Sequence, residues 1–130
     1  GNDHNILVDS WNRVKGIIDF GDMIHSFRVI EPSVAMAYIA IEDNNFELIA
    51  SLIKGYHSIV PLSMDELKAA IYFMCLRMCV SITMSAKRKI LFPENKYIST
   101  SEENARKFLI KMREQDIQNM SHEFVDYVRS

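Results

Sequence analysis

Three oxygen-bearing side chains near the start of the sequence could bind a cation. Asn5 opens the stretch NILV, and Asp19 and Asp22 follow in GIIDFGDM, directly after a short apolar run. An amide and a few carboxylate oxygens, with room left for water and phosphate oxygens, suit magnesium bound together with a nucleotide. The same residue types are common at strand ends, where Asn lies in a turn and Asp caps backbone amides. Spacing alone favours this second interpretation.

The other titratable residues give weaker signals. A structural zinc site needs Cys and His at close spacing, and the histidines are scattered: His4, His25, His57 and His122. His25 could contact phosphate or substrate, although a partly buried, hydrogen-bonded histidine is the commoner role. Arg77, the one charge in an apolar run, could bind an anionic substrate group or pair with a carboxylate such as Asp22 or Glu31. The ion pair is favoured because an unpaired buried charge is costly.

The first twenty residues predict a β-hairpin that would bring Asn5 close to Asp19. NILV and VKGIID have strand character, and DSWNR between them is rich in turn-forming residues. With residues 9–13 as the loop, Val8 lies opposite Val14, and Asn5 falls near residues 17–19. Cross-strand neighbours lie about 5 Å apart at their β-carbons. An amide oxygen and a carboxylate could therefore meet on one cation at the open end of the hairpin.

Two helices are predicted after the hairpin. Apolar residues at spacings of three and four indicate a helix over residues 29–41, with Pro32 in its first turn, and a second over residues 44–56, with Gly55 as its stop. The first of these helices should bury one apolar face, formed by Ile30, Val34, Ala37, Tyr38 and Ile41.

Cap signatures predict the remaining helices. Ser63 and Glu66 have the spacing of a capping box in front of a long apolar run, and Thr100 and Glu103 have it again further on. A last short helix could begin at Ser121. The sequence thus predicts an α+β fold, mostly α, in a single domain over residues 1–130: a hairpin over residues 5–19, then four to five helices within residues 23–130.

The hairpin needs a partner surface. An isolated two-stranded hairpin is marginally stable in water, so the helices are expected to cover one of its faces. The other face is left for a missing part of the protein or for self-association through a second copy.

Composition limits the partners. The net charge of −2 and the pI near 6.1 give no basic excess, so nucleic acid and an anionic membrane surface are not expected partners. Residues 69–86 form an apolar run at the lower length limit for a membrane span, but polar residues inside it favour a buried helix. Cys75 and Cys79, at helical spacing, should be small buried groups in a reducing compartment. With no signal peptide at the start, a cytoplasmic location is predicted.

The order of the hairpin residues resembles that of a known superfamily. An Asn opening one strand, a tight hairpin and then Asp-Phe-Gly is the order in kinase-like phosphotransferases, where the catalytic-loop Asn and the Asp hold the metal. The stretches that carry the resemblance are NDHNILVDSWNRVKGIIDFGDM, GDMIHSFRVIEPSVAMAYIAI, GYHSIVPLSMDEL and CLRMCVSITMSA. They look like the aminoglycoside phosphotransferase and choline kinase superfamily, in particular hydroxylysine kinase and the phosphotransferases fused to class III aminotransferases. Homoserine kinase-like proteins are more distant.

The resemblance covers most of residues 1 to about 115 and implies the C-terminal lobe of a protein-kinase-like fold. The implied activity is magnesium-dependent transfer of phosphate from ATP or GTP to a hydroxyl of an amino acid or amino alcohol. Asn5 and Asp19 would be the magnesium ligands and bind the nucleotide through the metal. Asp22 would be an auxiliary acid, and His25 and Arg77 remain candidates for substrate contact.

The chain also departs from the superfamily. The catalytic His-x-Asp would fall just ahead of Gly1, and the N-terminal lobe with its nucleotide-pairing lysine is missing. No catalytic residue is therefore assigned. We expect these 130 residues to be the C-terminal part of a small-molecule kinase, unable to turn over alone. The alternative is a non-catalytic helical module that works by binding a partner, as a relic of a kinase.

Overall fold

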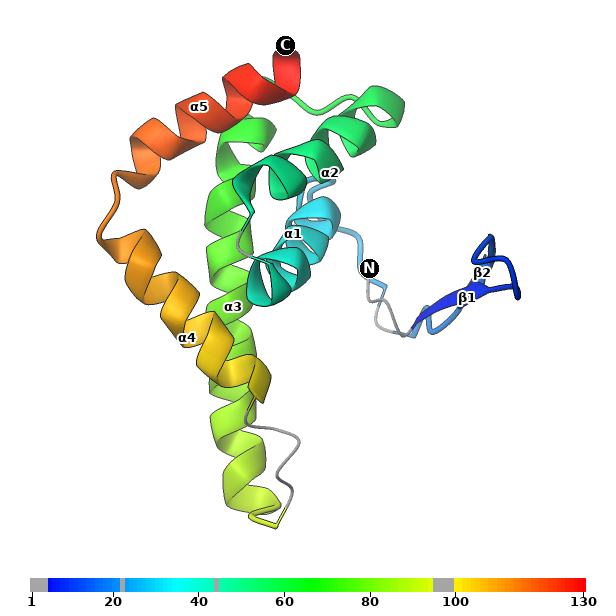
Figure 1. The fold of residues 1–130 in the computed structure, drawn as a ribbon, viewed down its shortest axis with the longest axis vertical. Helices are drawn as coiled ribbons and strands as arrows, with labels where there is room; N and C mark the ends of the chain where they lie inside the picture. Colours follow the sequence, from blue (N-terminus) through cyan, green and yellow to red (C-terminus); the bar gives the residue numbers. More distant parts are fainter. Residues whose placement is uncertain (1–4, 22, 44, 95–99) are drawn as a thin grey trace.

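The computed structural model describes residues 5–21, 23–43, 45–94 and 100–130, and in these ranges a β-hairpin is followed by five helices (Figure 1). The mostly helical α+β fold predicted from the sequence is confirmed. The strands are β1 (Ile6–Val8) and β2 (Val14–Ile17), and the helices are α1 (Ile30–Glu42), α2 (Phe46–Ile59), α3 (Met64–Leu91), α4 (Thr100–Arg113) and α5 (Ile117–Arg129).

The hairpin has the predicted register. β1 and β2 are antiparallel, with Val8 paired to Val14, and an irregularity after Leu7 twists the ribbon. Asp9 closes the loop, because its carboxylate accepts hydrogen bonds from the backbone N–H of Trp11 at 2.9 Å and of Arg13 at 3.0 Å. The Arg13 Nε donates to the same carboxylate at 2.8 Å. Local side-chain hydrogen bonds therefore explain why the five-residue loop forms here.

The expectation that the helices cover one face of the hairpin is wrong. Figure 1 shows the hairpin projecting away from the helices, and its apolar side chains are exposed on both faces. The strands are only three and four residues long, so they offer little apolar area to a helix, and the helices bury their own apolar faces against one another. The exposed side chains of the hairpin are Ile6, Leu7, Val8, Trp11, Val14 and Ile17.

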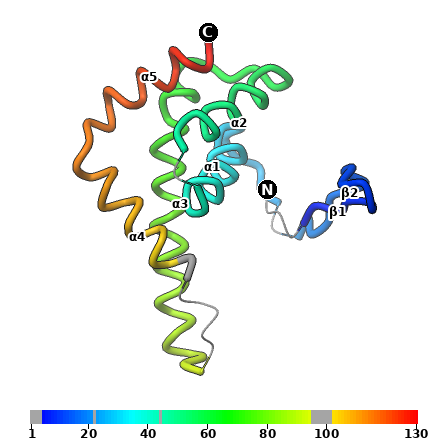
Figure 2. Tube along the Cα trace, in the orientation of Figure 1, coloured from blue at the N-terminus to red at the C-terminus, as the bar shows by residue number. Residues whose placement is uncertain are grey.

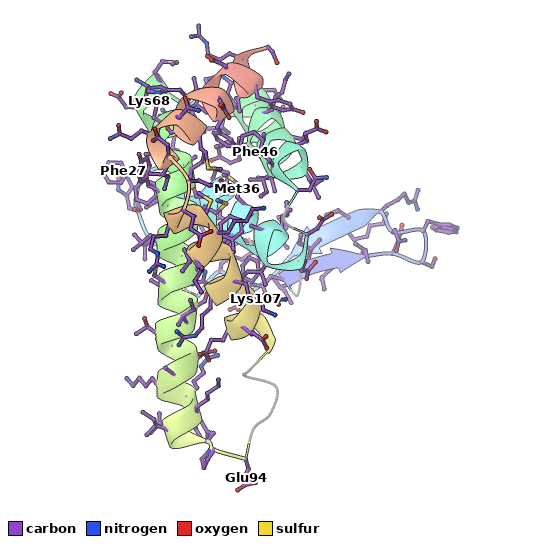
Figure 3. The ribbon with its side chains drawn as sticks, turned by 60° about the vertical axis from the view of Figure 1, so that its left-hand side comes forward. Phe27, Met36, Phe46, Lys68, Glu94 and Lys107 are labelled. Atoms are coloured by element: carbon purple, nitrogen blue, oxygen red, sulfur yellow. The ribbon has the colours of Figure 1, made fainter. Side chains whose placement is uncertain are left out.

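The core lies between the first half of α3 and helices α1, α2, α4 and α5. Met36 of α1, Ile53 of α2 and Phe124 of α5 are fully buried there, and Figure 3 shows Met36 among the helices. The ring of Phe46 meets the ring of Phe124 edge to face, with 6.0 Å between their centroids. Figure 2 shows α4 and α5 meeting at an angle on one side of α3, on the side away from the hairpin.

The buried face of α1 differs from the predicted one. Of the predicted face, only Ala37 is fully buried. The side of the helix that faces the core carries Pro32, Ser33, Met36, Ala37 and Ala40. Ser33 tolerates complete burial because its hydroxyl donates a hydrogen bond to the Val29 carbonyl at 2.6 Å.

Two predicted helix ends are also wrong. α2 continues through Gly55 and ends before Pro61, since Gly55 has no positive φ that would terminate a helix. α5 begins at Ile117, where the Asp116 carboxylate accepts from two backbone N–H groups of the first turn. Ser121 instead lies inside α5, buried, and donates to the Lys68 carbonyl of α3 at 2.9 Å.

Of the two predicted capping boxes, the one at Ser63 is confirmed. Its hydroxyl accepts from the Glu66 N–H, and the Glu66 carboxylate accepts from the Ser63 N–H. Thr100 is already helical, and residues 95–99 before it lie outside the described residues. The carboxylate of Glu103 pairs with Lys107 at 2.7 Å.

Helix α3 is only partly the buried helix that the sequence predicts. Its core side is buried, but its other side is exposed, and the second half of α3 extends beyond the other helices except α4 (Figure 1). Within the described residues it is the one helix long and apolar enough to cross a membrane by length and composition, and 22% of its apolar window is buried. Cys75 is half-buried, whereas Cys79 is exposed, contrary to expectation.

Candidate functional site

The hairpin places Asn5 next to the residues that lead into Asp19. The Ile18 N–H donates to the Asn5 carbonyl at 2.9 Å, so Asn5 lies across the ribbon from the residue directly before Asp19. Asn5 is half-buried and Asp19 is exposed. The backbone proximity that the hairpin count predicts is therefore present. The third predicted oxygen ligand, Asp22, lies outside the described residues.

Asp19 has an unusual backbone conformation. Its φ of 63° lies in the left-handed region, and among the described non-glycine residues only the loop residue Asn12 shares this feature. Asn and Asp adopt this conformation more readily than other L-residues, and left-handed positions outside glycine cluster at functional sites. The turn directs the carboxylate over Gly21, because Asp19 Oδ1 lies 3.9 Å from where a β-carbon on Gly21 would be.

The side-chain oxygens at the end of the hairpin are of the type that binds hard cations such as magnesium. The end of the hairpin offers one amide oxygen and one carboxylate, both hard ligands, with solvent on the exposed side of Asp19. The described residues include no cluster of three or more His, Cys, Asp or Glu side chains that could hold a metal by themselves. A magnesium ion held by only two side-chain oxygens would take its remaining ligands from water and phosphate oxygens.

The remaining candidates do not all gather at the hairpin. His25 is exposed on the segment between the hairpin and α1, so the expectation of a partly buried histidine is wrong. Arg77 lies on α3, where its Nη2 donates to the Tyr38 hydroxyl at 3.0 Å and its guanidinium lies 5.7 Å from the ring centroid. Its buried Nε has no hydrogen-bond partner among the described residues. Among the described residues, Tyr38 is thus the contact that the structure gives Arg77. Asp22, one of the carboxylates expected to pair with Arg77, lies outside the described residues.

A polar junction that the sequence did not predict anchors the chain between the hairpin and the helices. Arg28 Nη2 contacts Glu66 Oε2 at 3.2 Å, and the Tyr56 hydroxyl donates to the Arg28 carbonyl at 3.3 Å. The Ser63 N–H, together with Arg28, lowers the pKa of Glu66. Because Arg28 and Glu66 are 38 residues apart, no local pattern could indicate their contact. The junction fixes where the segment that leaves the hairpin joins α1.

A pocket of about 480 Å³ lies apart from the hairpin, among α2, α3, α4 and α5. Its inner wall is apolar, with Phe46 and Phe108, and Lys111 and Glu123 lie at its rim. Of the predicted site residues that the structure describes, none lines this pocket. Figure 1 shows α4 and α5, which contribute much of the pocket's lining, on the side of α3 away from the hairpin.

The chain is similar to curated hydroxylysine kinases. It is 36% identical to the Mus musculus protein over 104 residues, which are 73% of this chain and 28% of that protein. It is 32% identical to the Bos taurus protein over 121 residues, which are 85% of this chain and 32% of that protein. The resemblance predicted from the sequence is thereby confirmed, and the chain spans about a third or less of the relatives' length.

Neither a family model nor a solved structure matches the chain.

Proposed function

We propose that this chain supplies the metal-binding part of a small-molecule phosphotransferase related to hydroxylysine kinases. The substrate would be a hydroxyl group of an amino acid or amino alcohol, and the phosphate donor ATP or GTP with magnesium. One observation carries the proposal. In a chain that is similar to hydroxylysine kinases, the hairpin brings Asn5 beside Asp19, and Asp19 has the left-handed backbone that strained functional positions show.

In this proposal Asn5 and Asp19 would hold the magnesium ion through their side-chain oxygens. When bound, the ion would supply positive charge to the oxygens of the β- and γ-phosphates. The chain's own contribution is to hold Asn5 and Asp19 close to each other. The hydrogen bond from Ile18 to Asn5 holds the two strands together at this end, and the Asp19 carboxylate lies beside Gly21. Asp22 and His25, further along the same segment, and Arg77 on α3 are the candidates for substrate contact.

We also propose that residues 1–130 alone do not turn over. Phosphoryl transfer needs a residue that orients the attacking hydroxyl and further cations on the phosphates, and by resemblance these positions precede Gly1. Two free cysteines among the described residues suit the proposed cytoplasmic location. We further propose that two copies of the chain associate through the exposed faces of their hairpins.

A second function, binding of a protein partner by a non-catalytic helical module, is favoured by one observation. The hairpin exposes apolar side chains on both faces, with Trp11 74% exposed at its tip. Exposed apolar side chains gathered in one place commonly mark a protein-interaction surface. In that case the hairpin would bind a partner rather than a metal and nucleotide.

Metal titration of the 130-residue chain tests the first proposal. Manganese, a paramagnetic substitute for magnesium, is added with and without ATP, and the broadening of backbone amide signals is followed by NMR. We expect the amides of Asn5 and Asp19 to broaden first. Asp19→Asn should weaken the binding at least tenfold, because a charged ligand becomes neutral.

Asp126→Asn, on the exposed side of α5, is the matched control and should leave the titration unchanged. Equal broadening in the wild type and in Asp19→Asn would show that Asp19 is not a ligand. The same samples, given hydroxylysine, homoserine, choline or an aminoglycoside with ATP or GTP, should show no phosphate transfer.

A further inference from the structure

The exposed side of α3 carries an apolar stripe directly opposite its buried side. At 3.6 residues per turn, each residue advances about 100° around the helix axis. The core side carries Leu67, Ala70, Ile71, Met74 and Met78. The opposite side carries Tyr72, Leu76 and Val80, whose side chains are 43%, 56% and 44% exposed.

The stripe has the spacing of a helix-pairing seam. Its residues follow at intervals of three and four, as in coiled coils: Asp65, Ala69, Tyr72, Leu76, Val80, Thr83, Lys87 and Ile90. The two charged members, Asp65 and Lys87, lie near opposite ends of α3. Both are exposed, and neither forms an ion pair within the described part of the chain.

We propose that α3 pairs antiparallel with α3 of a second copy of this chain, with the two-fold axis at Leu76. Positions equidistant from Leu76 then meet their counterparts. Tyr72 faces Val80, Ala69 faces Thr83, and Asp65 faces Lys87, so that apolar residues meet each other in the middle and opposite charges meet at both ends. The two ion pairs lie about 33 Å apart along the seam.

Charge complementarity selects a second copy in this orientation. A two-fold interface must be self-complementary, because each contact occurs twice. The antiparallel arrangement fulfils this with two Asp65–Lys87 pairs, whereas a parallel one would place like charges together. It also makes the two helix dipoles antiparallel, so that the N-terminus of each α3 lies beside the C-terminus of the other. The buried side of α3 points away from the seam, so the pairing leaves the core intact. This inference does not depend on the proposed phosphotransferase function.

Charge reversal tests the pairing. The dimerisation constant of the 130-residue chain is measured by sedimentation for Asp65→Lys, for Lys87→Glu and for the double variant. Each single reversal creates two like-charge contacts and should weaken dimerisation about tenfold. The double reversal restores opposite charges and should return the constant to near that of the wild type. Glu114→Lys, the same charge change as Asp65→Lys but outside the stripe, should have little effect.

A cross-link tests the position of the axis. Leu76→Cys in a Cys79→Ser background places two thiols across the axis, so mild oxidation should give a disulfide-linked dimer. Ile59→Cys in the same background, 82% exposed on α2, is the matched control and should remain unlinked. The native Cys75 is half-buried and should not take part.

Several outcomes would overturn the proposal. A chain that is monomeric at all accessible concentrations has no such interface, and a double reversal that fails to restore the dimer excludes this register. A dimer lost in Val14→Asn but unaffected by both charge reversals would assign the contact to the hairpin. Binding of the stripe to phosphatidylcholine vesicles, without a dimer in solution, would show that it faces lipid. Protection of the thiol at position 76 in a monomeric longer chain would show that another segment covers the stripe.

Discussion

Cys75 and Cys79 lie one helical turn apart on α3 in different surroundings. Burial, with a smaller contribution from Cys79, raises the pKa of Cys75 to about 11, whereas Cys79 is exposed. Because the thiolate is the reactive form, we expect iodoacetamide near neutral pH to modify Cys79 well before Cys75. Mass spectrometry of the digested protein over time measures both rates. In Cys79→Ser only the slow reaction should remain, and equal rates in the wild type would contradict the prediction.

At the scale of single residues, the sequence predicted the backbone proximity of Asn5 and Asp19, which depends only on neighbouring residues of the hairpin. Counting along a five-residue loop was enough to bring Asn5 near Asp19. The φ of Asp19 was not predictable, since Asp adopts both ordinary and left-handed backbone. The contact of Arg77 with Tyr38 joins residues 39 positions apart, and no pattern within either helix indicates it.

At the scale of elements, the capping box of α3 is expected to contribute measurably to stability. Ser63→Ala removes the hydroxyl that accepts the Glu66 N–H at 3.2 Å, which typically costs about 1 kcal/mol of unfolding free energy. Ser63→Asp keeps an acceptor and adds a charge favourable to the helix N-terminus, so it should lose much less. Urea denaturation followed by circular dichroism measures both. Equal losses of unfolding free energy in the two variants would show that the hydrogen-bond acceptor at position 63 does not stabilise α3.

Helix existence followed from apolar spacing, but helix ends depended on features outside the pattern. The signature at Ser63 was reliable because both halves of the box are local. The helix end predicted at Gly55 was wrong because a glycine ends a helix when it adopts a positive φ. Gly55 does not adopt one, and α2 continues through it. The start of α5 was missed because the Asp116 cap stands among polar residues that give no apolar contrast.

At the scale of the whole molecule, Glu102 joins α4 to the far end of α3. It is 8% exposed, and its carboxylate oxygens lie 2.8 Å from Lys89 Nζ and 2.9 Å from Arg106 Nη2. These contacts with positive charges, that of Lys89 first, lower the pKa of Glu102 below the ordinary 4.5. The stabilisation is therefore complete above pH 4.5 and is lost as the pH falls through the lower folded-state pKa.

Glu102→Gln tests this link. We expect the variant to be less stable than the wild type near neutral pH, and the difference in unfolding free energy to shrink as the pH falls below 4.5. Urea midpoints measured across this pH range give the difference. Glu103→Gln, which removes an exposed ion pair on the same helix, is the matched control and should show a smaller change. A difference independent of pH would rule out the ion pairs as its cause.

The relative placement of the elements was the least predictable level. Apolar spacing predicts which side of a helix is buried, but not which other element packs against that side. Which surfaces are covered depends on contacts between segments far apart in the sequence, and the local apolar pattern does not specify these contacts. The exposed side of α3 and the exposed hairpin were therefore not predictable.

The separation of the hairpin from the helices bears on how the protein opens. A unit without buried contacts to the rest can unfold by itself, so its amide hydrogens should exchange with deuterium far faster than those of α1 or α3. The free energy of global unfolding then does not describe how often the hairpin around Asn5 and Asp19 is folded. Whatever binds at the end of the hairpin must itself hold these strands together, and its affinity is reduced by the cost of closing them.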